Sequence, residues 1–201
     1  MFYLISISTA TLLIALGNFL VDQSYQFGAF GRHLLYTVLG VAAVFAIDGV
    51  AAFVIRRMPE RWFAPDSPLF LVGKREKNFY RFTGLNTWKR YVPEWGCFTG
   101  FHKDKLQKTI NSAYIGRFLL ESNYGVAGHI AGALLGYLIL LLPFLRPLSV
   151  ALPIAAVNMV LSILPTMILR FNTPALRSLY RRTLERERRA EVAEENPVGN
   201  R

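Results

Sequence analysis

Two apolar runs joined by a short turn decide the fold of this chain. Together they occupy residues 126–169, VAGHIAGALLGYLILLLPFLRPLSVALPIAAVNMVLSILPTMIL. The turn at Arg146-Pro147 separates runs 126–145 and 148–169, and each run has about the 20 residues that a helix needs to cross a bilayer core of about 30 Å. Because the turn is too short to hold a domain, we expect the two spans to form a helical hairpin.

Two more apolar runs precede the hairpin, at residues 1–21 and 33–55. The first run contains no charged side chain and lacks the basic start and small-residue cleavage site of a signal peptide, which favours a retained span. The second run contains Asp48, whose carboxylate is costly at that depth and has either a binding or proton-accepting role or a structural one. The sequence therefore predicts an all-α integral membrane protein with about four transmembrane helices, organised as a single membrane domain over residues 1–201.

The remaining residues form two polar segments beside the spans. Residues 56–125 combine Trp, Tyr and Phe with Lys and Arg, a composition typical of a layer at the lipid headgroups. We expect them to form a cytoplasmic interfacial region between spans two and three, whose last part, residues 103–122, is a helix that enters the membrane. In residues 170–201, Leu176 and Tyr180 belong to apolar positions that recur at helical spacing among arginines. This pattern indicates a basic amphipathic helix followed by a solvated tail.

The charge of the chain is strongly positive and unevenly distributed. The 201 residues include 23 Lys and Arg against 13 Asp and Glu, a net charge of +10, and 53% of the residues are hydrophobic. The basic residues gather beside the spans, where positive-inside retention and anionic membrane lipids account for them without nucleic acid as a partner. We therefore expect both termini on the cytoplasmic side. A single cysteine, Cys97, excludes an intramolecular disulfide, and the sequence does not indicate an oligomeric state.

Three ionisable residues near the start of span three are candidates for chemistry. Arg117 and Glu121 are four residues apart on one predicted helix, and His129 follows eight residues later with a drift of about 80°, so the three share one broad face. Histidine can take a proton from a hydroxyl group near neutral pH, and a carboxylate can orient its imidazole. The same residues could instead form a polar contact that holds helices together, and the spacing leaves both interpretations open.

A second group of candidates borders span four. Arg170 and Asn172 lie at its predicted cytoplasmic end, where an arginine is also explained as a membrane anchor. The predicted topology places them and the Trp88-Lys89 pair at the same membrane depth as the candidates of span three, so we expect all of them to converge on one site. The chain has no P-loop and no GxGxxG, GxSxG or HExxH motif. Together with only three histidines, this predicts no bound cofactor and no metal.

Three segments of the chain form an ordered set: EKNFYRFTGLNTWKRYVPEWG (76–96), YIGRFLLESNYGVAGH (114–129) and LPTMILRFNTPALRSL (164–179). In order and spacing they resemble the glycosyl-4,4'-diaponeurosporenoate acyltransferases of carotenoid biosynthesis. With the intervening spans, the resemblance covers residues 70–180. One departure is Val126, which stands where that family usually carries a second glutamate three residues before the histidine.

The resemblance implies transfer of a fatty acyl group onto a sugar hydroxyl of a glycosylated carotenoid or similar glycolipid, in the bacterial inner (cytoplasmic) membrane. An acyl thioester would be the cosubstrate. His129 would be the general base, with Glu121 orienting it. The substrate-binding residues would be Arg117, Arg170, Asn172, Lys89, Trp88 and Glu76. The alternative, which the departure at Val126 favours, is a non-catalytic membrane subunit or lipid-binding protein that retains the fold.

Overall fold

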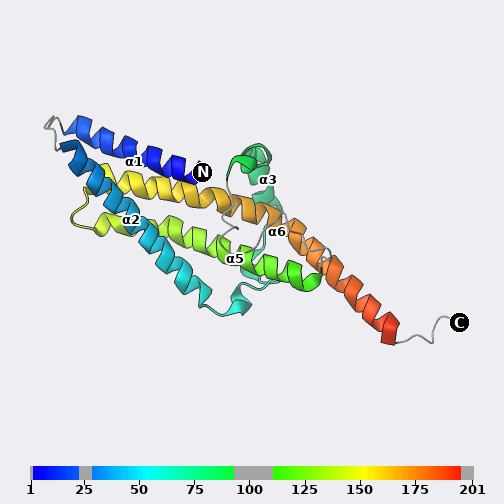
Figure 1. Cartoon of the computed structure of the whole chain (residues 1–201). Coiled ribbons are helices and arrows are strands. Elements are labelled where there is room, and N and C mark those ends of the chain that lie inside the picture. Colours follow the sequence, from blue (N-terminus) through cyan, green and yellow to red (C-terminus); the bar gives the residue numbers. More distant parts are fainter. Residues whose placement is uncertain (1, 23–28, 93–110, 196–201) are drawn as a thin grey trace.

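The computed structural model describes residues 2–22, 29–92 and 111–195, and every regular element within those ranges is a helix (Figure 1). Four helices are long and apolar enough to cross a membrane. They are α1 (Phe2–Val21), α2 (Ala29–Arg56), α5 (Ser112–Leu135), which the 3₁₀ segment η5 (Gly136–Leu141) continues, and α6 (Leu152–Glu195), which follows the π-helical turn η6 (Pro147–Ala151). The structure confirms the predicted all-α class with four spans.

The long helices pack as a bundle. In Figure 1, α5 and α6 lie side by side over much of their length, while α2 packs on α5 and α1 packs on α2. The end of α1, the start of α2 and the η5–η6 connection lie at one end of the bundle, which we call the turn end. Residues 57–92 lie toward the other end, which we call the open end.

The turn end has a tightly packed apolar core. Val44 of α2, Leu145 of the hairpin turn and Ile154 of α6 are among its buried residues. A Cβ atom at Gly40 would lie 2.6 Å from Cδ1 of Ile154, so a larger residue at this position would force the Ile154 side chain to move within a closely packed core. On the outer faces of the bundle many Leu, Val and Phe side chains stay exposed, for example Val50 at 63%. Helices surrounded by lipid present such faces.

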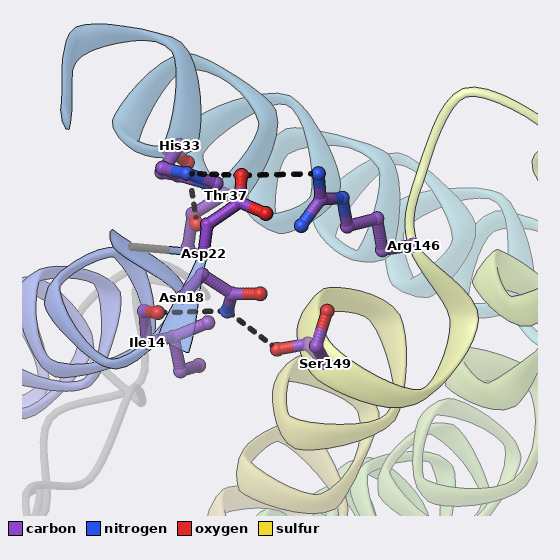
Figure 2. A network of polar contacts seen from close by, with 7 residues as sticks. All are labelled: Ile14, Asn18, Asp22, His33, Thr37, Arg146 and Ser149. Carbon is purple, nitrogen blue, oxygen red and sulfur yellow. Dashed lines mark hydrogen bonds and ion pairs between the residues drawn. The ribbon is translucent and has the colours of Figure 1, made fainter. Parts of the chain in front are cut away.

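A polar network joins the helices at the turn end (Figure 2). Asp22 lies 3.3 Å from Nε2 of His33 and 3.2 Å from Nη2 of Arg146. The hydrogen bond from Arg146 holds the pKa of the Asp22 carboxyl below its ordinary value. Nearby, the Asn18 amide donates to the Ser149 carbonyl at 2.7 Å. These contacts connect α1, α2 and the hairpin turn, so the network fastens three elements together at this end.

Short helical pieces make up the segment at the open end. They are η1 (Glu60–Trp62), η2 (Pro68–Phe70), α3 (Lys74–Phe82), α4 (Leu85–Trp88) and η3 (Lys89–Tyr91). The segment is attached to α5 by Asn123, whose amide donates to the Phe63 carbonyl at 2.8 Å. Beside it the Phe63 ring stacks on Tyr124 with centroids 4.2 Å apart. Residues 57–92 thus form a fixed layer on the bundle.

Helix α6 differs from the prediction. Span four and the basic amphipathic helix after residue 169 were expected as two elements, but they form one continuous helix of 44 residues. Pro165 and Pro174 lie inside it without ending it, since neighbouring elements can support a helix around a proline. Helix α5 is described from Ser112, where the Asn111 side chain accepts from the Tyr114 N–H at 2.8 Å. Most of the predicted entry helix, residues 103–110, lies outside the described residues.

Candidate functional site: a cavity between the four helices

One elongated cavity of about 760 Å³ lies among α1, α2, α5 and α6. Its lining is mainly apolar, and on α6 it extends from Ile154 near the turn end to Leu176 near the open end. These positions are 22 residues apart, or about 33 Å along a helix. The cavity therefore has the length of a bilayer core and suits a long, apolar molecule.

The packing of α5 against α6 sets the depth of each side chain in the bundle. A Cβ atom at Gly125 would lie 3.2 Å from Cδ1 of Leu169, and one at Gly136 would lie 2.7 Å from Nδ2 of Asn158. The two helices are antiparallel, so deeper positions on α5 face earlier positions on α6. His129 is eight residues deeper than Glu121, about 12 Å along the axis. His129 therefore does not share the depth of Glu121, and for this residue the prediction of one common depth is wrong.

At the open end a charged cluster borders the cavity. The two oxygens of Glu121 accept from different arginines, Oε2 from Arg56 at 2.9 Å and Oε1 from Arg117 at 2.8 Å. Glu121, Arg56 and Asn172 all line the cavity, whereas Arg117 lies beside it. We call these four residues the charged mouth. Glu121 thus positions two cations at the mouth, and it does not hydrogen-bond to His129.

His129 lines the cavity two turns further in. Its side chain is partly buried, and it forms no hydrogen bond or ion pair with any residue in the described part of the chain. Glycines at 125, 128 and 132 flank it on the same helix and also line the cavity. An imidazole with free nitrogen atoms in an apolar cavity can exchange a proton with a bound molecule.

A second polar pair lies about one turn deeper than His129. The Asn158 amide donates to the Gly132 carbonyl at 3.2 Å and lies 3.4 Å from Oδ1 of Asp48. A Cβ atom at Gly132 would lie only 2.8 Å from Oδ1 of Asp48. Asp48 and Asn158 both line the cavity, so its inner half contains one carboxyl and one amide group.

Arg170 and Glu76 form an ion pair away from the cavity. Nη2 of Arg170 lies 2.9 Å from Oε2 of Glu76, and Nε also donates to Oε1. The Tyr80 hydroxyl donates to the same carboxylate. The hydrogen bond from Arg170 lowers the pKa of Glu76, while burial and then the Glu76 carboxylate raise the pKa of Tyr80 to about 12. This pair fixes α3 to α6, and neither residue lines the cavity.

Trp88 and Lys89 also contact α6 behind the cavity wall. Nε1 of Trp88 donates to the Thr83 carbonyl at 3.0 Å, and the ring packs against a small core that includes Val92 and Ile168. Nζ of Lys89 lies 5.6 Å from the ring centroid of Phe171. Since Val92 and Ile168 line the cavity, Trp88 supports its wall from behind.

The structure therefore divides the predicted site residues into two groups. Glu121, His129 and Asn172 line one cavity, with Arg117 at its mouth, whereas Glu76, Trp88, Lys89 and Arg170 fasten the segment of the open end to α6. Sequence reasoning missed Arg56 and Asn158. A usable signal existed for Asn158, which is the one carboxamide in run 148–169. Arg56 resembled an ordinary membrane anchor.

Four helices long and apolar enough to cross a membrane, packed around an apolar cavity with a charged mouth, define a polytopic membrane protein. Residues 59–182 match the family model of the glycosyl-4,4'-diaponeurosporenoate acyltransferases. The match covers more than half of the chain, so the protein belongs to this family, and the resemblance of residues 70–180 is confirmed. No curated protein and no solved structure matches the chain.

Proposed function

We propose that the protein transfers a fatty acyl group from an acyl thioester to a sugar hydroxyl of a glycosylated carotenoid or similar glycolipid. The observation that carries the proposal is the free imidazole of His129 inside an apolar cavity whose mouth is charged. The long apolar part of a lipid fits the cavity, and the polar part of a substrate fits the mouth. Membership of the acyltransferase family supports this reading of the geometry.

The proposed reaction needs one proton carrier. The acceptor hydroxyl oxygen attacks the thioester carbonyl, the new C–O ester bond forms and the C–S bond breaks. His129 takes the hydroxyl proton during attack and returns it to the departing thiolate, so that protons balance. The Asn172 amide is a neutral donor at the mouth, away from the deeper His129, and would hydrogen-bond to the polar part of the acyl donor. Arg56 and Arg117, held by Glu121, would attract the polar part of a donor.

The departure at Val126 does not remove a group from the cavity. Val126 is 1% exposed and belongs to the core cluster that contains Phe63 and Tyr124, and it is not among the residues that line the cavity. A glutamate at this position would point into that core. The valine is therefore compatible with activity, although it also fits the alternative of a non-catalytic lipid-binding subunit.

Membranes that contain the wild-type protein, His129→Ala or His129→Gln test the proposal. With an acyl thioester and a glycosylated carotenoid, we expect both variants to lose about 10²- to 10⁴-fold in acyl transfer. Their melting temperatures should match the wild type, because His129 forms no described hydrogen bond. Near-normal transfer by His129→Ala would remove the general-base role. An inactive wild type that retains a bound glycolipid would favour the lipid-binding alternative.

A further inference from the structure

Arg177 of α6 is a buried arginine whose guanidinium is mostly unpaired. The residue is 8% exposed. Nη2 donates to the Ser67 carbonyl at 2.8 Å, but Nε and Nη1 have no hydrogen-bond partner among the described residues. A buried charged group without partners is costly, and such donors are normally satisfied by protein, water or a ligand. Arg177 therefore points to an acceptor from outside the chain.

The side chain of Arg177 lines a pocket of its own. This pocket has a volume of about 290 Å³ and is separate from the cavity between the helices. Two further arginines of α6, Arg181 and Arg182, line it, and Leu71 and Val72 close its other side. We call it the arginine pocket.

The arginine pocket has an excess of positive charge. Among the described residues, no carboxylate forms an ion pair with Arg177, Arg181 or Arg182. Asp66 is the acidic group whose charge acts on Arg177, and its side chain is exposed, whereas Arg181 and Arg170 add repulsion. Three guanidinium groups around one concave site attract an anion with several acceptor oxygens.

We propose that the arginine pocket binds a phosphate group. The planar fork of a guanidinium matches phosphate oxygens with two parallel hydrogen bonds, and the exposed Arg181 and Arg182 can offer such forks. The unpaired Nε and Nη1 of Arg177 lie on different edges of its guanidinium, so each can donate a single hydrogen bond. Two sources share this chemistry: the phosphates of a soluble acyl donor and the headgroup of an anionic lipid. The proposal rests on Arg177 and its pocket, and it holds whether or not the protein transfers acyl groups.

The arginine pocket lies next to the charged mouth, on the same turns of α6. On one face of α6, Asn172 and Leu176 line the cavity. On the other face of the same turns, Thr173 and Arg177 line the arginine pocket. A helix with side chains is about 10 to 12 Å across, so one extended ligand or two separate molecules can occupy both openings.

The full-length protein in phosphatidylcholine nanodiscs tests the proposal by binding, without an activity assay. Inorganic pyrophosphate and coenzyme A are titrated while the melting temperature is followed, because a ligand of the folded state raises it. A parallel sample in nanodiscs with phosphatidylglycerol is analysed by native mass spectrometry for retained lipid. The variants are Arg177→Met, the exposed double variant Arg181→Gln/Arg182→Gln, and Arg186→Gln. Arg186 is an exposed arginine of α6 outside the pocket and serves as the charge-matched control.

We expect Arg177→Met and the double variant to bind at least about tenfold more weakly than the wild type, and Arg186→Gln to stay within about twofold. A response to pyrophosphate or coenzyme A alone identifies a soluble donor, and Arg177-dependent retention of phosphatidylglycerol alone identifies a headgroup. The proposal is wrong if neither probe nor retained lipid distinguishes the wild type from the double variant, which removes only exposed side chains. His129→Ala should bind the phosphate probe normally, which separates this outcome from failure of the proposed function.

Discussion

Arg170 and Glu76 face each other across the boundary between α6 and α3, with two hydrogen bonds joining the guanidinium to the carboxylate. The side chains are 18% and 27% exposed, so water screens the pair only in part. A third contact, from Nη2 of Arg170 to the Leu71 carbonyl at 3.2 Å, extends the attachment to the neighbouring turn. Arg170 is therefore a positioning residue that holds the segment of the open end against the bundle.

Replacing Arg170 by lysine should loosen that attachment. A lysine keeps the charge but offers a single point of contact in place of two parallel hydrogen bonds. We expect Arg170→Lys to lose about 1 to 3 kcal/mol of unfolding free energy, measured by denaturation in detergent. Arg75→Lys, which changes an exposed arginine of the same helix as Glu76, should have no effect. Equal stability of both variants would show that the pair does not fasten α3.

The same pair should make stability depend on pH. Because Arg170 lowers the pKa of Glu76 below its ordinary value of 4.5, the folded state binds the proton more weakly than the unfolded state. The stabilisation is then complete above about pH 4.5 and disappears as the pH falls through the lower folded-state pKa. We expect the difference in melting temperature between wild type and Glu76→Gln to be constant from pH 7 to 5 and to shrink below 4.5. A difference that grows on acidification would contradict this sign.

Two glycines of α5 provide a matched test of the contact between Asp48 and Asn158. A methyl group at Gly132 would lie 2.8 Å from Oδ1 of Asp48, whereas one at Gly128 would meet nothing within 4 Å. We expect Gly132→Ala to displace the Asp48 carboxyl from Asn158 and to cost about 1 to 3 kcal/mol. Gly128 lines the same cavity, and we expect Gly128→Ala to leave the free energy of unfolding unchanged or to raise it. Similar melting temperatures for the two variants would refute the close packing of α2 on α5.

Glu121 should affect substrate affinity more than turnover. Since its carboxylate binds Arg56 and Arg117, Glu121→Gln should release two arginines at the mouth and raise KM for the donor several-fold, with a smaller effect on kcat. The pH dependence of kcat should stay unchanged, because the imidazole of His129 lies about 12 Å deeper along the helix. A shifted pH profile in this variant would instead place the carboxylate beside His129.

The orientation of the bundle in the membrane is a further prediction. The basic residues of 56–117 and 170–189 place the open end on the cytoplasmic side by the positive-inside rule. A reporter tag inserted at position 31 or 147 should therefore be accessible from outside the inner membrane, and a tag at the C-terminus should not. Cytoplasmic signal from either turn-end tag would reverse this topology.

The spans could be predicted because the length of an apolar run is a local property of the sequence. The continuity of α6 could not, since Pro165 and Pro174 normally indicate a helix boundary and only the packing of the finished bundle supports them. The site was predicted in part. Glu121 and His129 were correctly assigned to one helix, but a shared face does not mean a shared depth.

The contacts of the candidate residues depend on how helices that are far apart in the sequence are shifted along one another. Asp48 meets Asn158 across 110 positions and Arg170 meets Glu76 across 94. No spacing rule gives the relative height of two helices that are not neighbours in sequence. The arginines of α6 were explained by orientation in the membrane, and only the burial of Arg177 distinguishes it from the others.

Helix α6 is about 66 Å long at 1.5 Å per residue, roughly twice the thickness of a bilayer core. Its turns around residues 172–177 separate two openings, so any rotation of those turns about the helix axis moves both walls at once. We expect occupancy of one opening to change the affinity of the other, and thermodynamic reciprocity requires the same factor in both directions. Helix α6, which forms a wall of both sites, would then couple binding in the cavity to binding in the arginine pocket.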